Sequence, residues 1–389
     1  MVIHQTPGVY REDVFPTRPT ALPTGVPAFL GLAAAGDPNV PVRLTLASQL
    51  PETFGPPRSD GYLAAAVAGF FANGGEQCFV VRLAEGGDPV QALADGLASL
   101  APVDDLDLVC APDLFVSSGT DYLGLLAAAR MQNALLDHCD TQGDRFALLD
   151  AQPGADVNAV LAQRSGLAGT NGALYYPWLK VAGDPRSVPP CGHLAGIVAR
   201  SDQKVGVHKA PANEVVAGAV DLEVILTDTL QASLNPVGVN ALRAFPGRGI
   251  RVWGARTLSH EAAWTYVNVR RLFLTAIRWI ERNLGAVAFE PNDPKLWTRI
   301  GRELKVYFEA LFRAGALKGR TAAEAFYVKC DAETNPPEVR EAGRVVTEIG
   351  LAPANPNEFV VVRIIHGVGG VGGIGGIGGV TLAGPSPGA

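Results

Sequence analysis

Thiol, imidazole and carboxylate side chains are the groups that could hold a metal or perform acid–base catalysis in this chain. The five cysteines, Cys78, Cys110, Cys139, Cys191 and Cys330, stand singly, without a CxxC pair. The close Cys/His neighbours, His138 with Cys139 and Cys191 with His193, lack a second ligand pair at metal spacing. We therefore expect reduced, mostly buried thiols and no metal site.

Motifs for catalysis or phosphate binding are also missing. The sequence contains no GxxxxGK[ST] loop, HExxH helix or GxSxG elbow. Gly367–Gly372 satisfies GxGxxG, but no helix-forming sequence or downstream acid follows it. The carboxylates Asp104, Asp105 and Asp107 are interpreted as a solvated strand end rather than as a metal or acid–base site. We expect no catalytic residue and no cofactor.

The composition is that of a folded, mildly acidic protein. The 389 residues include 32 Lys or Arg and 38 Asp or Glu, a net charge of −6, and 48% are hydrophobic. The N-terminus lacks the basic and apolar regions of a secretory signal, and no apolar run approaches the roughly 18 residues that span a bilayer. We expect cytoplasmic production and no direct membrane insertion.

The elements that would position any functional residue alternate between strand and helix. Strands are predicted at Ala28–Leu32, Cys78–Leu83, Leu106–Cys110, Arg145–Leu149, Ala173–Tyr176 and Ile250–Trp253, and helices at Tyr62–Phe71, Tyr122–Cys139 and Val157–Gly166. This order is typical of a mostly parallel α/β sheet covered on both faces. The prolines between Pro185 and Pro211 predict long loops.

The C-terminal third carries most of the positive charge. Two long helices are predicted between Glu261 and Gly315, broken near Pro291. Residues 243–320 hold 15 Lys or Arg against 6 Asp or Glu. Two basic stripes result from the helical spacing, Arg271, Arg278 and Arg282 on the first helix and Lys295, Arg299, Arg302 and Arg313 on the second. The stripes are either solvated faces or a surface for an acidic partner.

Strand-like segments lie near both ends. Gly8–Val14 forms a short extended piece between prolines, too thin to fold alone, and strands are predicted at Ala325–Cys330, Val345–Ala352 and Glu358–Ile365. A terminal strand such as the last one has to be paired or covered. Signals for an interaction protein are thus stronger than those for an enzyme.

Several motifs in order resemble the sheath subunits of contractile phage tails, most closely those of extracellular contractile injection systems. The matching segments are Thr6–Tyr10, Phe71–Gly75, Tyr175–Trp178, Lys209–Asn213, Val252–Leu258, Tyr266–Phe273, Phe289–Asn292 and Pro353–Phe359. The resemblance implies a structural, non-enzymatic subunit that polymerises helically around an inner tube and contracts.

The resemblance also implies a division of the chain. We expect an N-terminal arm (1–20), an outer α/β domain with a mostly parallel sheet (21–255), an inner α+β domain (256–352), a C-terminal strand arm (353–366) and a Gly-rich tail (367–389). The arms would add strands to sheets of neighbouring subunits. The candidate intersubunit residues are Gly8, Val9, Tyr10, Arg11 and Val14, and Phe359, Val360, Val361, Val362, Arg363 and Ile364.

The implied partners are further copies in a helical sheath, the inner tube protein, baseplate and terminator or cap proteins, and sheath paralogues where the producer has them. The inner domain faces the tube in this family. The candidate tube-facing residues are therefore Arg271, Arg278, Arg282, Lys295, Arg299 and Arg302. We expect assembly in the cytoplasm of a bacterial producer, into a particle that is either released or membrane-anchored.

Two other functions remain open at this point. An α/β enzyme would have a cleft at the carboxyl ends of its strands. A nucleic-acid-binding protein would use the basic segment 243–320, although no stacking motif accompanies the charge. In the tail, Val368, Val371, Ile374, Ile377 and Val380 recur every third residue. The tail is interpreted as a flexible surface extension, with docking of this apolar edge on a neighbour as the alternative.

Overall fold

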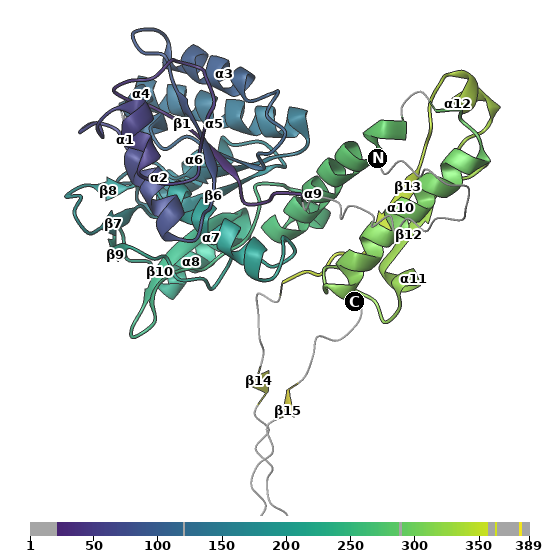
Figure 1. The fold of residues 1–389 in the computed structure, drawn as a ribbon. Coiled ribbons are helices and arrows are strands. Elements are labelled where there is room, and N and C mark those ends of the chain that lie inside the picture. Colours follow the sequence, from purple (N-terminus) through teal and green to yellow (C-terminus); the bar gives the residue numbers. More distant parts are fainter. Residues whose placement is uncertain (1–21, 120, 288–289, 357–361, 364–380, 383–389) are drawn as a thin grey trace, which may run out of the picture.

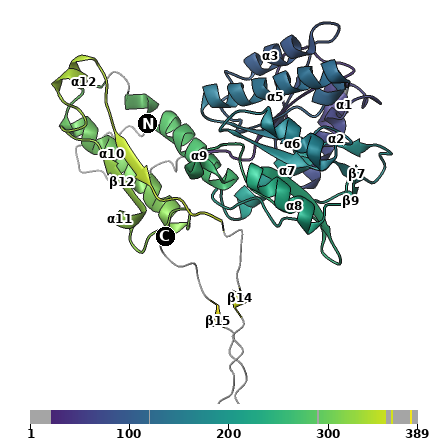
Figure 2. The ribbon, with the colours of Figure 1, turned by 180° about the vertical axis from the view of Figure 1, so that it is seen from behind.

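The protein has two lobes, which one long helix joins (Figures 1 and 2). A computed structural model describes residues 22–119, 121–287, 290–356, 362–363 and 381–382. The first lobe is a sheet between two layers of helices, and the second is a smaller helical and two-stranded unit. The joining helix, α9 (Val267–Leu284), lies between them.

An eight-stranded sheet forms the centre of the first lobe. Its order is β11-β10-β6-β5-β4-β1-β3-β2. The strands are β1 (Pro27–Gly31), β2 (Val42–Leu44), β3 (Cys78–Arg82), β4 (Leu108–Cys110), β5 (Phe146–Asp150), β6 (Gly172–Tyr176), β10 (Val239–Phe245) and β11 (Gly249–Val252). Six neighbouring strands, β3 to β10 in this order, are parallel, and β2 and β11 are antiparallel edges. The mostly parallel α/β fold is thus confirmed.

Helices cover both faces of this sheet, as a parallel sheet requires. Alternate strand residues enter two separate cores: Phe29 packs on one side and Leu30 on the other. The first core includes α1 (Gln49–Phe54), α2 (Leu63–Ala72), α7 (Cys191–Lys204) and the start of α9. The second includes α3 (Pro89–Ser99), α4 (Leu114–Ser118), α5 (Tyr122–Gln142), α6 (Val157–Ser165) and α8 (Asp228–Leu234).

Helices α2 and α7 approach each other closely on the first face. An added Cβ would come within 2.2 Å of the Ala66 carbonyl oxygen at Gly192, and within 2.3 Å of the Phe70 carbonyl oxygen at Gly196. Only glycine permits this spacing without displacing one helix. The two helices therefore form one tightly packed layer. A small sheet of β7 (Leu179–Val181), β8 (Ser187–Val188) and β9 (Ala219–Leu222) lies beside them.

The second lobe is built on α10 (Pro294–Arg313). Asp293 caps this helix by accepting hydrogen bonds from the amides of Lys295 and Leu296, and Pro294 occupies the first helical position. One face of α10 buries Ile300, Leu304 and Phe308 against the C-terminal half of α9. Trp279 and Tyr307 stack between the helices, with ring centroids 4.0 Å apart.

A two-stranded antiparallel sheet also packs on α10. It consists of β12 (Phe326–Lys329) and β13 (Glu348–Leu351), with short helices α11 (Ala322–Ala325) and α12 (Pro337–Glu341) beside it. Strand residues Phe326, Val328, Ile349 and Leu351 pack on α10. The last described pair, β14 (Val362–Arg363) and β15 (Thr381–Leu382), lies away from both lobes (Figure 1).

The helices and strands predicted from the sequence occur in the observed order where a clear hydrophobic period or a capping residue indicated them. One prediction is wrong: the proline-rich stretch after Pro185 is not all loop, because α7 begins directly after Pro190 and buries most of its residues. A helix that is buried all round lacks the amphipathic period by which helices are recognised.

Candidate assembly site

The predicted basic stripe of α9 lies on one helix face, but that face is turned toward the first lobe. Arg271 is 2% exposed and Arg278 is 4% exposed, whereas about half of the Arg282 side chain is accessible. The seven- and four-residue spacing places the three arginines on one face of the helix, but it cannot show whether that face meets solvent or another part of the protein. The expected exposure is therefore wrong for Arg271 and Arg278.

Arg271 forms a buried ion triad with carboxylates from two other elements. Its Nη1 and Nη2 donate to the two Asp202 oxygens at 2.9 and 2.7 Å, and Nη2 also donates to Asp107 Oδ2 at 2.8 Å. Burial alone would lower the pKa of Arg271, but the two carboxylates outweigh it and raise the pKa. The triad ties α9 to α7 and to the start of β4.

Asp107 is a structural anchor rather than a solvated strand end, which corrects the prediction. It is 5% exposed and accepts hydrogen bonds from the amides of Gly25 at 3.1 Å and Val26 at 2.7 Å, in addition to Arg271. Spacing could not show this role, because each of its partners lies more than 80 residues away in sequence. Asp202 was missed because its partner Arg271 lies 69 residues away in sequence.

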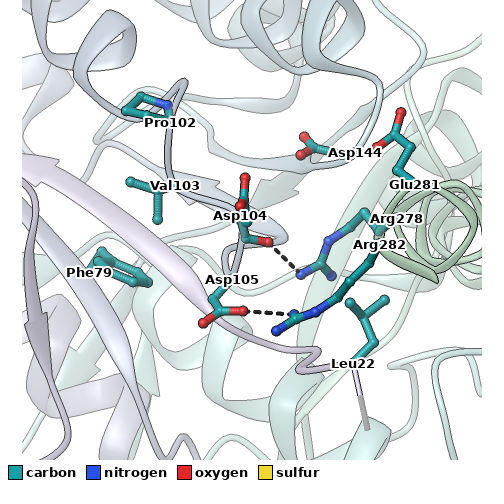
Figure 3. A pocket seen from close by; sticks show the side chains of 10 residues that line it. All are labelled: Leu22, Phe79, Pro102, Val103, Asp104, Asp105, Asp144, Arg278, Glu281 and Arg282. Carbon is teal, nitrogen blue, oxygen red and sulfur yellow. Dashed lines mark hydrogen bonds and ion pairs between the residues drawn. The ribbon is translucent and has the colours of Figure 1, made fainter. Parts of the chain in front are cut away.

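The other two arginines of the stripe border a hollow of about 650 Å³ between α9 and the loop before β4 (Figure 3). Arg278 donates to the carbonyl oxygens of Pro23 at 3.1 Å and Asp104 at 3.3 Å. Arg282 pairs with Asp105 at 3.0 Å. Leu22, the first described residue after the N-terminal arm, also lines this hollow. The stripe thus meets the point where the arm leaves the body.

The cations of α10 are placed differently. Lys295 and Arg302 are exposed and have no ion-pair partner within the described parts of the chain. Arg299 instead pairs with Glu290 at 2.7 Å and with Glu303 at 3.2 Å, and these bonds raise its pKa. Contact of any of these residues with a tube remains a prediction.

Lys305 is a fourth candidate on this helix that the prediction omitted. It is exposed, and it follows Arg302 by three residues, so the two side chains are neighbours on the helix surface. Val306, 65% exposed, lies beside them. Counting three-residue as well as four- and seven-residue spacings would have found Lys305 in the sequence.

The β12–β13 sheet has strand edges that no other described strand pairs. Its inner face is apolar, and its outer face carries Tyr327, which donates to Glu348 at 2.6 Å, and Lys329. A two-stranded ribbon is only marginally stable alone and exposes free N–H and C=O groups along its edges. Unpaired edges of this kind are where a further strand can add to a sheet.

The predicted strand arms fall mostly outside the described residues. This holds for Gly8, Val9, Tyr10, Arg11 and Val14, and for Phe359, Val360, Val361 and Ile364. Val362 and Arg363 are described, and they pair antiparallel with Leu382 and Thr381 of the same chain. The C-terminal tail thus supplies a strand partner for the arm, which the sequence analysis did not foresee.

The described residues also bear on metal binding and on membrane crossing. Within the described ranges, no three His, Cys, Asp or Glu side chains gather in a way that could hold a metal ion. The same ranges contain no helix with the length and apolar character that crossing a bilayer requires. Four of the five thiols are buried, and Cys330 is half-buried.

Family models identify the class of protein. The phage tail sheath protein central domain matches residues 97–258, and the phage tail sheath C-terminal domain matches residues 259–365. The chain therefore belongs to the phage tail sheath family. The tail sheath protein of Vibrio phage KVP40 is 25% identical over 240 residues, and that of Salmonella phage ViI is 30% identical over 183 residues. These matches cover 56% and 43% of this chain, but only 35% and 26% of the longer relatives.

Solved structures from contractile injection systems match nearly the whole chain. A chain of the anti-feeding prophage baseplate is 30% identical, with a TM-score of 0.77, and the match covers 94% of this chain and 100% of that one. A chain of the extracellular contractile injection system PVC, in its contracted sheath complex, is 27% identical with a TM-score of 0.76, over 95% and 99%. A sheath tail protein of Desulfitobacterium hafniense, 12% identical with a TM-score of 0.58, shares the fold over 83% and 94%.

Proposed function

We propose that this protein is a structural subunit of a contractile sheath, which polymerises helically around an inner tube and shortens to drive that tube through a target envelope. The observation that carries the proposal is the match over nearly the full length to a sheath chain in its contracted state. Curated tail sheath proteins support the same function. The subunit would act mechanically and not as an enzyme.

Strand addition is the proposed link between subunits. The β12–β13 sheet offers edges that are unpaired within the described chain. The 21 residues before Leu22, if extended, could reach about 70 Å at roughly 3.3 Å per residue, enough to leave their own subunit. Main-chain hydrogen bonds would give such a joint its strength, and alternate side chains would give it register. A contact that does not close on itself produces an open helix.

The energy of contraction would come from two alternative packings of the same subunits. No nucleotide is needed, because rigid bodies can rotate and repack while their connecting strands stay attached. The proposed partners are the inner tube, a baseplate and a cap or terminator protein, together with sheath paralogues where they exist. We place assembly in a bacterial cytoplasm, as part of a released or membrane-anchored particle.

Removing the N-terminal arm tests this function. Deletion of residues 1–17 should leave a folded monomer that forms no polymer, because the described body begins at Leu22 and its core would be intact. Circular dichroism would establish folding, and negative-stain electron microscopy would detect striated tubes in the full-length protein.

A second variant separates strand pairing from arm length. Replacing residues 1–17 by a Gly/Ser segment of equal length should also prevent polymerisation, because such a segment pairs poorly. Sheaths formed by either variant would contradict strand addition by this arm. Small discrete oligomers of the full-length protein, without tubes, would contradict the sheath function itself.

A further inference from the structure

The four residues directly before the first strand are held mainly by side chains of other elements. We call this segment, Pro23–Val26, the arm root. Its first contact with a neighbouring strand is at Val26, whose carbonyl accepts from the amides of Asp107 and Leu108 at 3.0 and 3.2 Å. Before that point the sheet does not set the direction of the chain.

Side chains of three elements surround the arm root. Asp107 accepts from the amides of Gly25 and Val26, and Arg278 of α9 donates to the Pro23 carbonyl. Burial raises the pKa of the Asp202 carboxyl of α7, whereas Arg271 and, less strongly, a side-chain hydrogen bond with Thr24 lower it. All four residues of the arm root are therefore held.

Close packing against α7 leaves the arm root little freedom to swing. Gly25 has a φ of +69°, and a Cβ at this position would come within 2.5 Å of the Ala199 Cα. Only glycine combines this backbone conformation with such an approach. The chain therefore passes between α7 and α9 along one path.

Helix α9 connects the side chains that hold the arm root to the second lobe. Arg271 joins Asp107 and Asp202, the two carboxylates that hold the arm root, and Arg278 lies two turns further along the same face. The C-terminal half of α9 then packs on α10 through Trp279 and Tyr307. A force on the arm root would thus reach the second lobe through one helix.

We propose that Arg271 and Arg278 are positioning residues, which fix the direction in which the N-terminal arm leaves the body and couple that direction to the second lobe. The inference rests on the proposed function, since an arm that links subunits needs a defined exit. It goes beyond strand addition, because it assigns the exit direction of the arm to two arginines that are buried within their own subunit.

The test compares two neighbouring arginines of α9. Arg278→Met removes the donors to the Pro23 and Asp104 carbonyl oxygens and keeps an unbranched apolar side chain. Arg282→Met is the matched control, because Arg282 contacts Asp105 and not the arm root. In each variant, spin labels on Thr20→Cys and Val306→Cys would report the distance between the arm and the second lobe by pulsed electron paramagnetic resonance. A Cys330→Ser background removes the half-buried native thiol.

We expect one narrow distance distribution in the wild-type background and in Arg282→Met, and a clearly broader one in Arg278→Met at an unchanged melting temperature. Arg278→Lys, which restores one donor, should narrow the distribution again. Equal distributions in Arg278→Met and Arg282→Met would overturn the proposal. A variant that unfolds would be replaced by Arg278→Lys alone, whose distribution should be intermediate between wild type and a fully released arm.

Polymer formation is a separate measurement on the same proteins. Arg278→Met should lower sheath yield by roughly tenfold, on the scale of one lost hydrogen bond to a charged group, while Arg282→Met should not. If the wild-type protein forms no sheath, the proposed function fails, but the label distances of the monomer still decide the role of Arg278. A broad distribution with full sheath yield would show that the exit direction does not matter for assembly.

Discussion

Asp107 and Asp150 show how strongly burial decides what a carboxylate does in this fold. Asp107 has a cationic partner in Arg271, together with two backbone amides. Asp150, at the end of β5, is also nearly buried, but the hydrogen bond recorded to its carboxylate comes from the neutral Cys191 amide, at 2.9 Å. Charged partners compensate the cost of burying an ion, and neutral ones do so only in part. The two sites should respond differently to pH.

Burial raises the pKa of Asp150 from 3.8 to about 7. The folded protein therefore binds this proton more tightly than the unfolded chain does. The resulting stabilisation is fully present below about pH 4 and is lost as the pH rises through about 7. The contribution of Asp150 to the free energy of unfolding should fall across this range.

Asp150→Asn should flatten this pH dependence, because an amide keeps an acceptor for the Cys191 amide and carries no charge. At pH 8 the variant should be more stable than the wild type by on the order of 2–4 kcal/mol, at about 1.4 kcal/mol per pKa unit. At pH 4 the two should be nearly equal. Urea denaturation at several pH values measures both quantities.

The exposed Asp37→Asn variant is the control for removing one negative charge. The free energy of unfolding of Asp150→Asn should still depend on pH to some extent, because burial also raises the pKa of Asp113, to about 6. Identical pH profiles for the wild type and Asp150→Asn would show that Asp150 is not the group responsible.

Helix α10 differs from α9 in how it uses its cations. The sequence places a basic stripe on both helices. Most of the α9 stripe is buried and forms contacts within the protein. On α10, by contrast, Lys295, Arg302 and Lys305 are exposed and unpaired in the described structure. The hypothesis of nucleic-acid binding through residues 243–320 loses part of its basis, because two of the stripe arginines are buried. Contact with an acidic tube surface fits the α10 face better.

Charge reversal on α10 tests that contact. Replacing Lys295, Arg302 and Lys305 by Glu should abolish assembly on the tube at low salt, because each exposed pair contributes about 0.2–1 kcal/mol and the loss repeats in every subunit. Melting temperature should change little. Cosedimentation with tube protein, at low and high salt, measures the effect.

Reversal of Arg130, Lys204 and Arg248 on the first lobe alters the net charge equally and should leave tube binding intact. Binding that fails in this control as well would point to net charge rather than to the α10 face. Normal sheath assembly by the α10 variant would remove these residues as tube contacts.

The sequence predicted the elements that carry a local signal. Strands with β-branched runs were found close to their observed bounds, as were helix α5 and helix α10, of which α10 has a clear amphipathic period. Helix α3 was missed, although Asp88 caps it and Pro89 starts it, a signal that was available. Helix α7 offered no such signal. The Arg271 triad lay beyond reach, because it joins residues brought together only by the complete fold.

Seen as a whole, the described molecule has two lobes, which helix α9 joins. The predicted domain boundaries stay predictions, and α9 contributes to the cores of both lobes. Family membership was predicted from scattered motifs and is confirmed by both family models. Which surfaces meet neighbouring subunits depends on the assembly, and a single sequence contains no record of it.

Removing the Gly-rich tail, residues 367–389, is a test at this scale. The tail contributes Thr381 and Leu382 to one short backbone pair with Val362 and Arg363. We therefore expect the melting temperature and sheath yield of the truncated protein to equal those of the full-length protein.

The alternative, docking of the tail on a neighbour, predicts a clear loss of sheath yield or of sheath stability. A truncation that stops at residue 383 is the matched control, because it retains β15. If both truncations lower the yield equally, the β14–β15 pair is not the cause.

The glycine contact between α2 and α7 has a mechanical consequence. Because the backbones of these helices meet directly at Gly192 and Gly196, they have little room to move closer or to slide past each other at these two points. The first lobe should then move as a rigid body under axial load. We expect changes of shape in α9 and in the connections between subunits instead. Sheath contraction would then proceed by rotation of rigid first lobes relative to one another, and not by elastic deformation within each lobe.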